Sequence, residues 1–130
     1  MDRQTFIVAC FLHKEVIMIK RGDIYYADLG NRYLCEQGGI RPVVILQNDK
    51  GNAHSPTTIV APITSKMKNK KIMPTHLQIN YRHLYTNSII LFEQIRTIDK
   101  SRLGQYICHM RNEDIEKLDS MIMISIGEKI

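Results

Sequence analysis

An arginine stands at the entrance of an apolar segment, directly after two glycines. Residues 38–42 read GGIRP, and the apolar run Val43–Leu46 follows. The paired glycines permit a sharp turn with a positive φ, and Pro42 suits the first residue of a strand, where no ladder donor is needed. Held there, Arg41 presents a planar, permanently charged fork that matches a phosphate group. An ordinary surface arginine after a hairpin turn explains the same residues, so both interpretations stay open at this point.

A hydroxyl group is the second candidate for chemistry. Thr64 ends the strand-like segment Thr57–Thr64 and converges with Arg41 if the two apolar segments are neighbouring strands. RNA cleavage by its own 2′-hydroxyl needs a group that takes a proton, a cation for the charge that develops on the phosphate, and a donor for the leaving oxygen. Arg41 would stabilise the charge, and Thr64 would bind the phosphate or relay a proton. Taken alone, Thr64 is better explained as an ordinary β-branched strand residue.

Metal and cofactor chemistry is disfavoured by the motifs. The five histidines share no motif and no metal-ligand spacing, and His76 is expected to be structural. The sequence has no H-E-x-x-H, no clustered carboxylates and no glycine-rich phosphate loop followed by lysine and a hydroxyl. We therefore predict no bound metal and no cofactor.

The elements that must position these residues are mostly strands. Apolar, β-branched and aromatic runs of strand length alternate with turn signals, which is typical of a small antiparallel barrel or a strongly bent sheet. Residues 49–52 and 55–56 are expected to break the chain between the second and third strands. The predicted strands are Asp23–Leu29, Pro42–Gln47, Thr57–Thr64, Thr75–Ile79 and Ser88–Ile98.

The C-terminal segment predicts a helix. Asn112 is a suitable N-cap, apolar residues recur at helical spacing from Ile115 to Ile126, and Gly127 is a plausible stop. Its apolar surface is wider than one stripe. A second subunit could cover the outer side, or the helix could belong wholly to the core of its own chain.

The composition fits one globular domain with a polyanionic or acidic partner. The 130 residues are 44% hydrophobic and 24% charged, with a formal net charge of +5. Cys10, Cys35 and Cys108 are odd in number without C-x-x-C spacing, which indicates unreactive thiols in a reducing cytoplasm. Lysines crowd residues 66–71 and form either a solvated loop or a rim that follows phosphates.

Five blocks, taken together, resemble the MazF/PemK family of toxin endoribonucleases, in the branch found in Gram-positive bacteria. The resemblance runs from about Met18 to the C-terminus, so residues 18–130 are predicted to be the toxin domain and residues 1–17 a non-functional extension. An extra strand or arm packed on the sheet is the alternative for residues 1–17. The blocks are Arg21–Leu29, Glu36–Asn48, Thr57–Ser65, Pro74–His76 and Glu93–Asp99.

The resemblance implies a fold, a reaction and partners. It implies a mainly β fold, a small SH3-like barrel with a C-terminal helix, and a homodimer. It implies a cytoplasmic type II toxin that cuts single-stranded mRNA without metal, leaving 2′,3′-cyclic phosphate and 5′-hydroxyl ends. Arg41 and Thr64 match the family's catalytic arginine and hydroxyl residue. The expected partner is an acidic MazE-like antitoxin, whose disordered tail folds onto the basic groove.

Two departures from the family pattern bear on the site. Some members carry Arg-x-Asp in the fifth strand, where this chain has Leu91 and Glu93, so it resembles the branch that relies on Arg41 and Thr64. Many members also have a glycine and a small polar residue where this chain has Leu34 and Cys35.

Polar side chains of the same blocks are expected to contact unstacked RNA bases. Tyr33 is a possible stacking platform. A non-enzymatic toxin that binds DNA gyrase, as the related CcdB toxins do on the same fold, is the rival, and it has no need for Arg41 with Thr64. The predicted RNA-binding residues are Glu36, Gln37, Asn48, Ser65, Glu93, Gln94 and Arg96.

Overall fold

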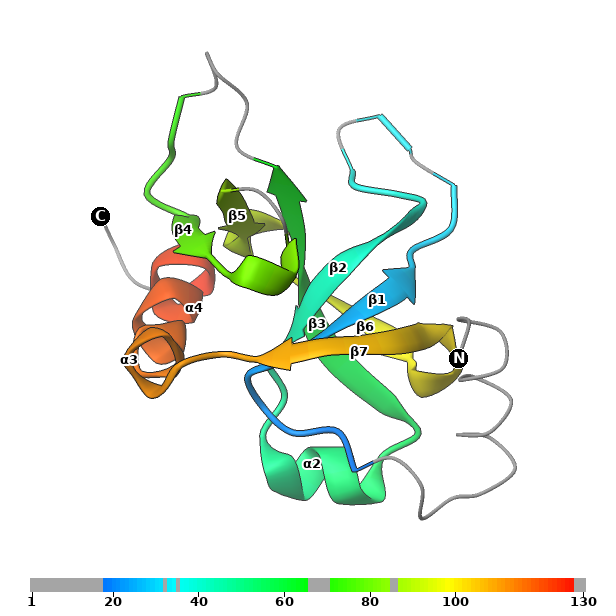
Figure 1. Cartoon of the computed structure of the whole chain (residues 1–130). Coiled ribbons are helices and arrows are strands. Elements are labelled where there is room, and N and C mark those ends of the chain that lie inside the picture. Colours follow the sequence, from blue (N-terminus) through cyan, green and yellow to red (C-terminus); the bar gives the residue numbers. More distant parts are fainter. Residues whose placement is uncertain (1–17, 32, 35, 66–70, 85–86, 128–130) are drawn as a thin grey trace.

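The computed structural model describes residues 18–31, 33–34, 36–65, 71–84 and 87–127. They form a strongly bent antiparallel sheet with helices at its ends (Figure 1). The strands are β1 (Asp23–Asp28), β2 (Ile40–Ile45), β3 (Thr57–Ser65), β4 (His76–Asn80), β5 (Asn87–Leu91), β6 (Arg96–Asp99) and β7 (Leu103–His109). The helices are α2 (Asp49–His54), α3 (Asn112–Ile115) and α4 (Leu118–Ile126), with short 3₁₀ turns η1 (Arg82–Leu84), η2 (Phe92–Gln94) and η3 (Lys100–Arg102).

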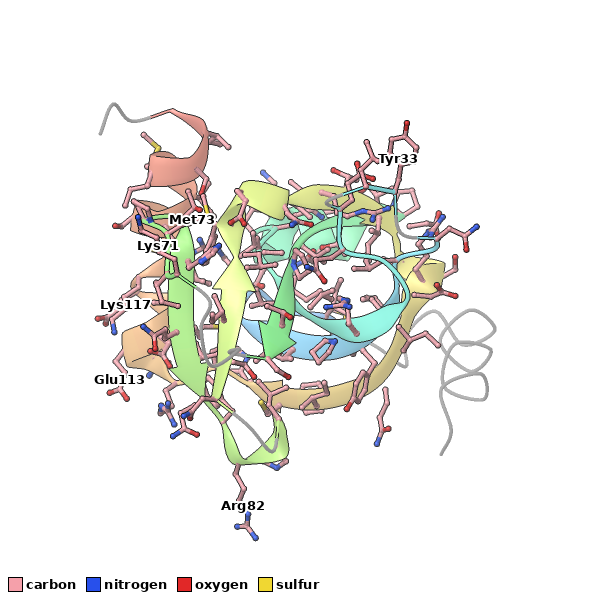
Figure 2. The ribbon with its side chains drawn as sticks, turned by 90° about the horizontal axis from the view of Figure 1, so that it is seen from above. Tyr33, Lys71, Met73, Arg82, Glu113 and Lys117 are labelled. Atoms are coloured by element: carbon pink, nitrogen blue, oxygen red, sulfur yellow. The ribbon has the colours of Figure 1, made fainter. Side chains whose placement is uncertain are left out.

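The sheet confirms the mainly β prediction and is open. Its strand order is β4-β5-β3-β2-β1-β7, and β6 pairs with β3 beside this path. Among the described strands, β4 and β7 therefore remain the two ends of a curved sheet and do not pair to close a barrel. Viewed from above, the strands curve around a centre filled with side chains (Figure 2).

The apolar strands bury both faces of this sheet. Along β1, Ile24 belongs to one buried cluster, whereas Tyr25 and Ala27 belong to another. Successive residues of a strand point to opposite faces, so two cores flank the sheet. The first core also holds Leu118 of α4, and the second holds Ile19.

The predicted fifth strand is wrong as one continuous element. Ile63 of β3 pairs with Ile90, whereas Val60, three residues back, pairs with Arg96, six residues on. β5 and β6 thus both pair with β3, but the chain between them is three residues longer than a continuous strand would be. These three residues form η2. The apolar run hid this interruption, because buried Phe92 continues the pattern.

Two expectations about the C-terminal helix are corrected, and one strand was missed. β7 was not predicted, and its pairing with β1 is irregular. The expected break between the second and third strands is present, and the helix α2 lies in it. The C-terminal helix is divided, because the Lys117 N–H bonds the Asp114 carbonyl three residues back and tightens the turn. Arg111 rather than Asn112 stands at the N-cap position.

Gly127 does end α4, as expected. Leu118 is buried against the sheet, and Ile126 is 71% exposed in the single chain. None of the helices in the described part of the chain is long and apolar enough to cross a membrane.

Candidate active site

Arg41 and Thr64 line one pocket of about 300 Å³. β2 and β3 are antiparallel neighbours, and Arg41 and Thr64 each lie two residues beyond their last described pair, Val43 with Pro62. Side chains two residues apart on a strand project from the same face, so Arg41 and Thr64 follow the face of that pair. The expectation that the two apolar segments are neighbouring strands is confirmed. The pocket is lined by Arg41, Pro42, Ile63, Thr64, Ser65, Leu84 and Ser88.

The glycine turn orients Arg41. Gly39 has a φ of +73°, in the left-handed region that glycine accommodates without strain. Arg41 is half-buried, and its Nε–H donates to the Gly38 carbonyl at 3.0 Å. Four of the five guanidinium N–H groups lie on the two Nη atoms, so a planar donor edge is turned away from this bond. That arrangement suits a phosphate in the pocket.

Pro42 is the third residue of β2 rather than its first. The described pairing with β3 starts at Val43, one residue later, so Pro42 lies where only β1 runs beside the strand. Proline has no backbone N–H, and at this position its absence leaves no hydrogen bond to β3 unmade.

The predicted RNA-binding residues other than Asn48 lie at the pocket, on the β1–β2 connection, in η2 and at the start of β6. Ser65 is exposed and lines the pocket itself. Glu36 is exposed in the connection between β1 and β2, and the neighbouring Gln37 donates its backbone N–H to Oε1 of Gln94 at 2.7 Å. Arg96 starts β6, and its Nη1 donates to the carbonyl of Leu29 at the end of β1.

Glu93 is held by β4 and the residue before it. Its Oε1 accepts the Thr75 hydroxyl and its Oε2 contacts Nε2 of His76, each at 3.0 Å. The backbone N–H of Met73 donates to Nδ1 of His76, so the proton of the neutral ring lies on Nε2. The His76 side chain is only 2% exposed. His76 is therefore structural, as expected.

Asn48 does not join the others. It caps α2, where its side chain accepts the Gly51 N–H at 2.8 Å. This helix lies at the opposite end of the molecule from the β1–β2 connection (Figure 1). The amide of an asparagine can cap a helix or contact a base, so the sequence alone did not decide between these two roles for Asn48.

The β1–β2 connection carries exposed apolar side chains. Tyr33 is 68% exposed and projects outward (Figure 2). Leu34 has a φ of +53°, a conformation that strains a leucine. Many members of the family that this sequence resembles have glycine at this position, and glycine adopts such a φ without strain. Cys35 lies outside the described residues.

Several expectations concern residues that the structure does not describe. Lys66, Lys68 and Lys70 lie outside the described residues, and Lys71 is exposed just before β4. Cys10 also lies outside, whereas Cys108 is half-buried as a free thiol. Burial, and to a smaller extent the charge of Asp23, raises the pKa of Cys108. The higher pKa favours the unreactive, protonated thiol. No three metal-ligating side chains gather anywhere in the described part of the chain.

Sequence reasoning missed Leu84 and Ser88 as pocket residues. Ser88 opens the predicted fifth strand, and its place opposite Ser65 follows only from the pairing of β3 with β5. Leu84 comes from η1, which showed no signal in the sequence.

Comparisons with known proteins find similar sequences and structures. The family described as PemK-like, MazF-like toxin of type II toxin–antitoxin system matches residues 20–126. Endoribonuclease EndoA of Bacillus subtilis (strain 168) is 47% identical over 113 residues, which are 85% of this chain and 97% of that protein.

Solved structures share the fold. MazF from Deinococcus radiodurans superposes with a TM-score of 0.71 at 19% identity, covering 86% of this chain and 99% of that one. An endoribonuclease in complex with its cognate antitoxin, from Mycobacterial species, has a TM-score of 0.70 at 21% identity, covering 86% of this chain and 98% of that one.

Proposed function

We propose a reaction for this chain on the premise that it belongs to the PemK-like, MazF-like toxins of type II toxin–antitoxin systems. The chain is an endoribonuclease that cleaves single-stranded mRNA at selected sequences and needs no metal. One observation carries the proposal: Arg41 and Thr64 line the same pocket. A protein that only binds gyrase has no use for this pair, and the Bacillus relative is named an endoribonuclease.

The residues of the pocket suit internal attack by a ribose hydroxyl. The 2′-oxygen attacks phosphorus and loses its proton, the bond to the 5′-oxygen breaks, and that oxygen takes up a proton, so the products are a 2′,3′-cyclic phosphate and a 5′-hydroxyl. The proton passes from the 2′-oxygen to the 5′-oxygen through the Thr64 hydroxyl or through solvent. Arg41 stabilises the negative charge that grows on the phosphate oxygens. Thr64 donates its hydroxyl to the same phosphate and helps to fix its orientation.

Bases next to the cut phosphate lie against the polar residues around the pocket. Glu36, Gln37, Ser65, Glu93 and Arg96 offer donors and acceptors to the edges of unstacked bases. Tyr33 offers an exposed ring for stacking. Asn48 is not included, because it caps a helix at the other end of the molecule.

The same family membership supports the partners. The net charge of +5 suits RNA and an acidic MazE-like antitoxin tail, and a mycobacterial structural neighbour was solved with its cognate antitoxin. The toxin acts in the cytoplasm as a homodimer. Exposed Met123 and Ile126 on α4 give an apolar surface that a second subunit can cover.

The test is cleavage of a long single-stranded transcript in the presence of EDTA. Mapped ends should carry a 5′-hydroxyl and a 2′,3′-cyclic phosphate, and the same sequence in a duplex should resist. Strict dependence on a divalent ion, or 5′-phosphate ends, would contradict the mechanism. Inhibition of gyrase without RNA cleavage would favour the rival function.

A further inference from the structure

A chain of hydrogen bonds runs from η2 to Arg41. The side-chain carbonyl of Gln94 accepts the backbone N–H of Gln37 at 2.7 Å. The next residue, Gly38, accepts the Nε–H of Arg41 through its carbonyl at 3.0 Å. Gln94 and Gln37 are 57 positions apart in the sequence. The contact therefore joins the end of the β1–β2 connection that precedes β2 to the turn η2.

This contact restrains the connection between its tip and its base. At its base, Gly39 bonds to both Leu29 and Gly30 through the backbone, which fixes the two ends of the loop. Leu34, at the tip, is exposed and strained. An amide acceptor that reaches Gln37 restrains the segment directly before the glycine turn, and with it the carbonyl that orients the guanidinium.

The other end of the chain of bonds is rigid. Buried Phe92 donates its backbone N–H to the Thr75 carbonyl at 3.0 Å. Both carboxylate oxygens of Glu93 are engaged, one by the Thr75 hydroxyl and one by buried His76. α4 also packs beside η2. Gln94 thus extends from a well-anchored turn.

We propose that Gln94 is a positioning residue for Arg41. Its side-chain carbonyl holds the Gln37–Gly38 segment so that the Gly38 carbonyl sets the plane of the Arg41 guanidinium toward the pocket. This inference rests on the proposed function and changes the role of Gln94 from a contact with a base to a support for the cation. Misplacement of a catalytic group by about 1 Å can cost about 100-fold in rate, so a support of this kind matters.

Two substitutions of Gln94 separate the effect of its acceptor oxygen from the effect of the rest of its side chain. Gln94→Met keeps the length and removes the acceptor, whereas Gln94→Glu keeps an acceptor oxygen and removes the amide donor. On an RNA oligonucleotide that spans a mapped cleavage site, Gln94→Met should lower kcat about 10- to 100-fold and change KM less than about 3-fold. Gln94→Glu should recover most of that loss. Gln105→Met, on an exposed glutamine of β7, is the matched control and should behave as the wild type.

Two further measurements link the effect to Arg41. In an Arg41→Ala background, Gln94→Met should cause almost no additional loss, because coupled residues are not additive. The Nε–H resonance of Arg41, assigned by its disappearance in Arg41→Lys, should be protected from exchange in the wild type and in Gln94→Glu but not in Gln94→Met. This second readout needs no activity, so it tests the positioning role even if the protein cuts no RNA.

Other outcomes would overturn the inference. If Gln94→Glu loses as much as Gln94→Met and both raise KM or change the cleavage sequence, Gln94 contacts RNA directly. If the Arg41 resonance is equally protected in all three proteins, Gln94 does not hold the guanidinium.

Discussion

At the scale of the residue, the guanidinium of Arg41 combines two roles that a simple cation cannot. One N–H orients the group on the Gly38 carbonyl, and we propose that the Nη edge binds a phosphate. A lysine has the charge but not the fork. Replacing the arginine by lysine and by alanine therefore separates charge from geometry.

We expect Arg41→Ala to lower the rate of RNA cleavage by about 10²- to 10³-fold, the usual loss for one group that stabilises developing charge. Arg41→Lys should also lose most activity, because it keeps the charge without the planar donor pair. Single-turnover cleavage measures both. Thermal melting is the control and should change little, since Arg41 lies in the pocket and not in either buried cluster. Near-full activity of Arg41→Lys would show that geometry is unimportant.

At the scale of the element, two contacts join the C-terminal helices to the sheet. The first is at Gly22, just before β1, where the backbone bonds both Ile45 and Met110. A β-carbon at this position would lie 2.7 Å from Cδ1 of Ile115 in α3. Gly22 also has a φ of +93°. The left-handed conformation favours glycine at this position, and the missing side chain leaves room for that of Ile115.

Gly22→Ala should therefore destabilise the protein through two terms. A left-handed conformation costs about 1–2 kcal/mol in alanine, and the clash with Ile115 adds about 1–3 kcal/mol. Gly39→Ala is the matched control: its φ is +73°, but an added β-carbon meets open space. Urea unfolding should give a clearly smaller loss for Gly39→Ala. Equal losses would show that the contact with Ile115 relaxes without cost.

The second contact is the phenol of Tyr81, directly after β4. Its hydroxyl donates to Oδ2 of Asp114 and accepts the Arg111 backbone N–H at 3.0 Å. The Arg111 guanidinium lies 4.3 Å from the centre of the ring. Burial first, and then the hydrogen bond to Asp114, raise the pKa of Tyr81 to about 12. The neutral phenol thus links β4 to the start of α3.

Tyr81→Phe should lower the free energy of unfolding by about 1–3 kcal/mol at neutral pH, because it leaves buried polar groups without their partner. The wild type should lose the Tyr81 contribution as pH rises from about 10 to 12, since the unfolded chain ionises Tyr81 near its ordinary value of 10.0 while the folded chain resists. Urea unfolding across this range should show the two proteins converging. Tyr33→Phe, on an exposed side chain, should change stability by less than about 0.5 kcal/mol. A constant difference at all pH values would contradict the linkage.

At the scale of the whole molecule, one bent sheet separates two cores and exposes the pocket where strands β2 and β3 begin and end. The second core includes Ile19, which is buried. Asp23 accepts the Lys20 backbone N–H at 2.9 Å. We propose that residues 18–130 are the working domain, because Ile19 and Lys20 already take part in the described fold.

We expect removal of residues 1–17 to leave cleavage within about 2-fold and the free energy of unfolding within about 0.5 kcal/mol of the full chain, the range of changes away from structured contacts. The comparison is between Met18–Ile130 and the full chain, by urea unfolding and by cleavage of the same transcript. A shorter control that begins at Lys20 and so removes Ile19 should be clearly less stable. Loss of stability or activity on removing residues 1–17 alone would assign them to the fold.

The sequence by itself determined most of the apolar strands, the apolar helix near the C-terminus, and the glycine turn that precedes an arginine. These features are local, because they depend on side-chain periodicity and on the backbone freedom of single residues. Only the tertiary structure decided that Ser88–Ile98 is interrupted by η2, because that interruption is a shift in pairing with β3 and not a change in hydrophobicity. It also decided between identical chemical groups: the amide of Asn48 caps a helix, and the amide of Gln94 reaches the loop beside Arg41. The partner of Asn48 is three residues away, but Gln94 and Gln37 are 57 positions apart. Partners as distant as the latter are brought together by the three-dimensional path of the backbone, on which the local sequence carries little information.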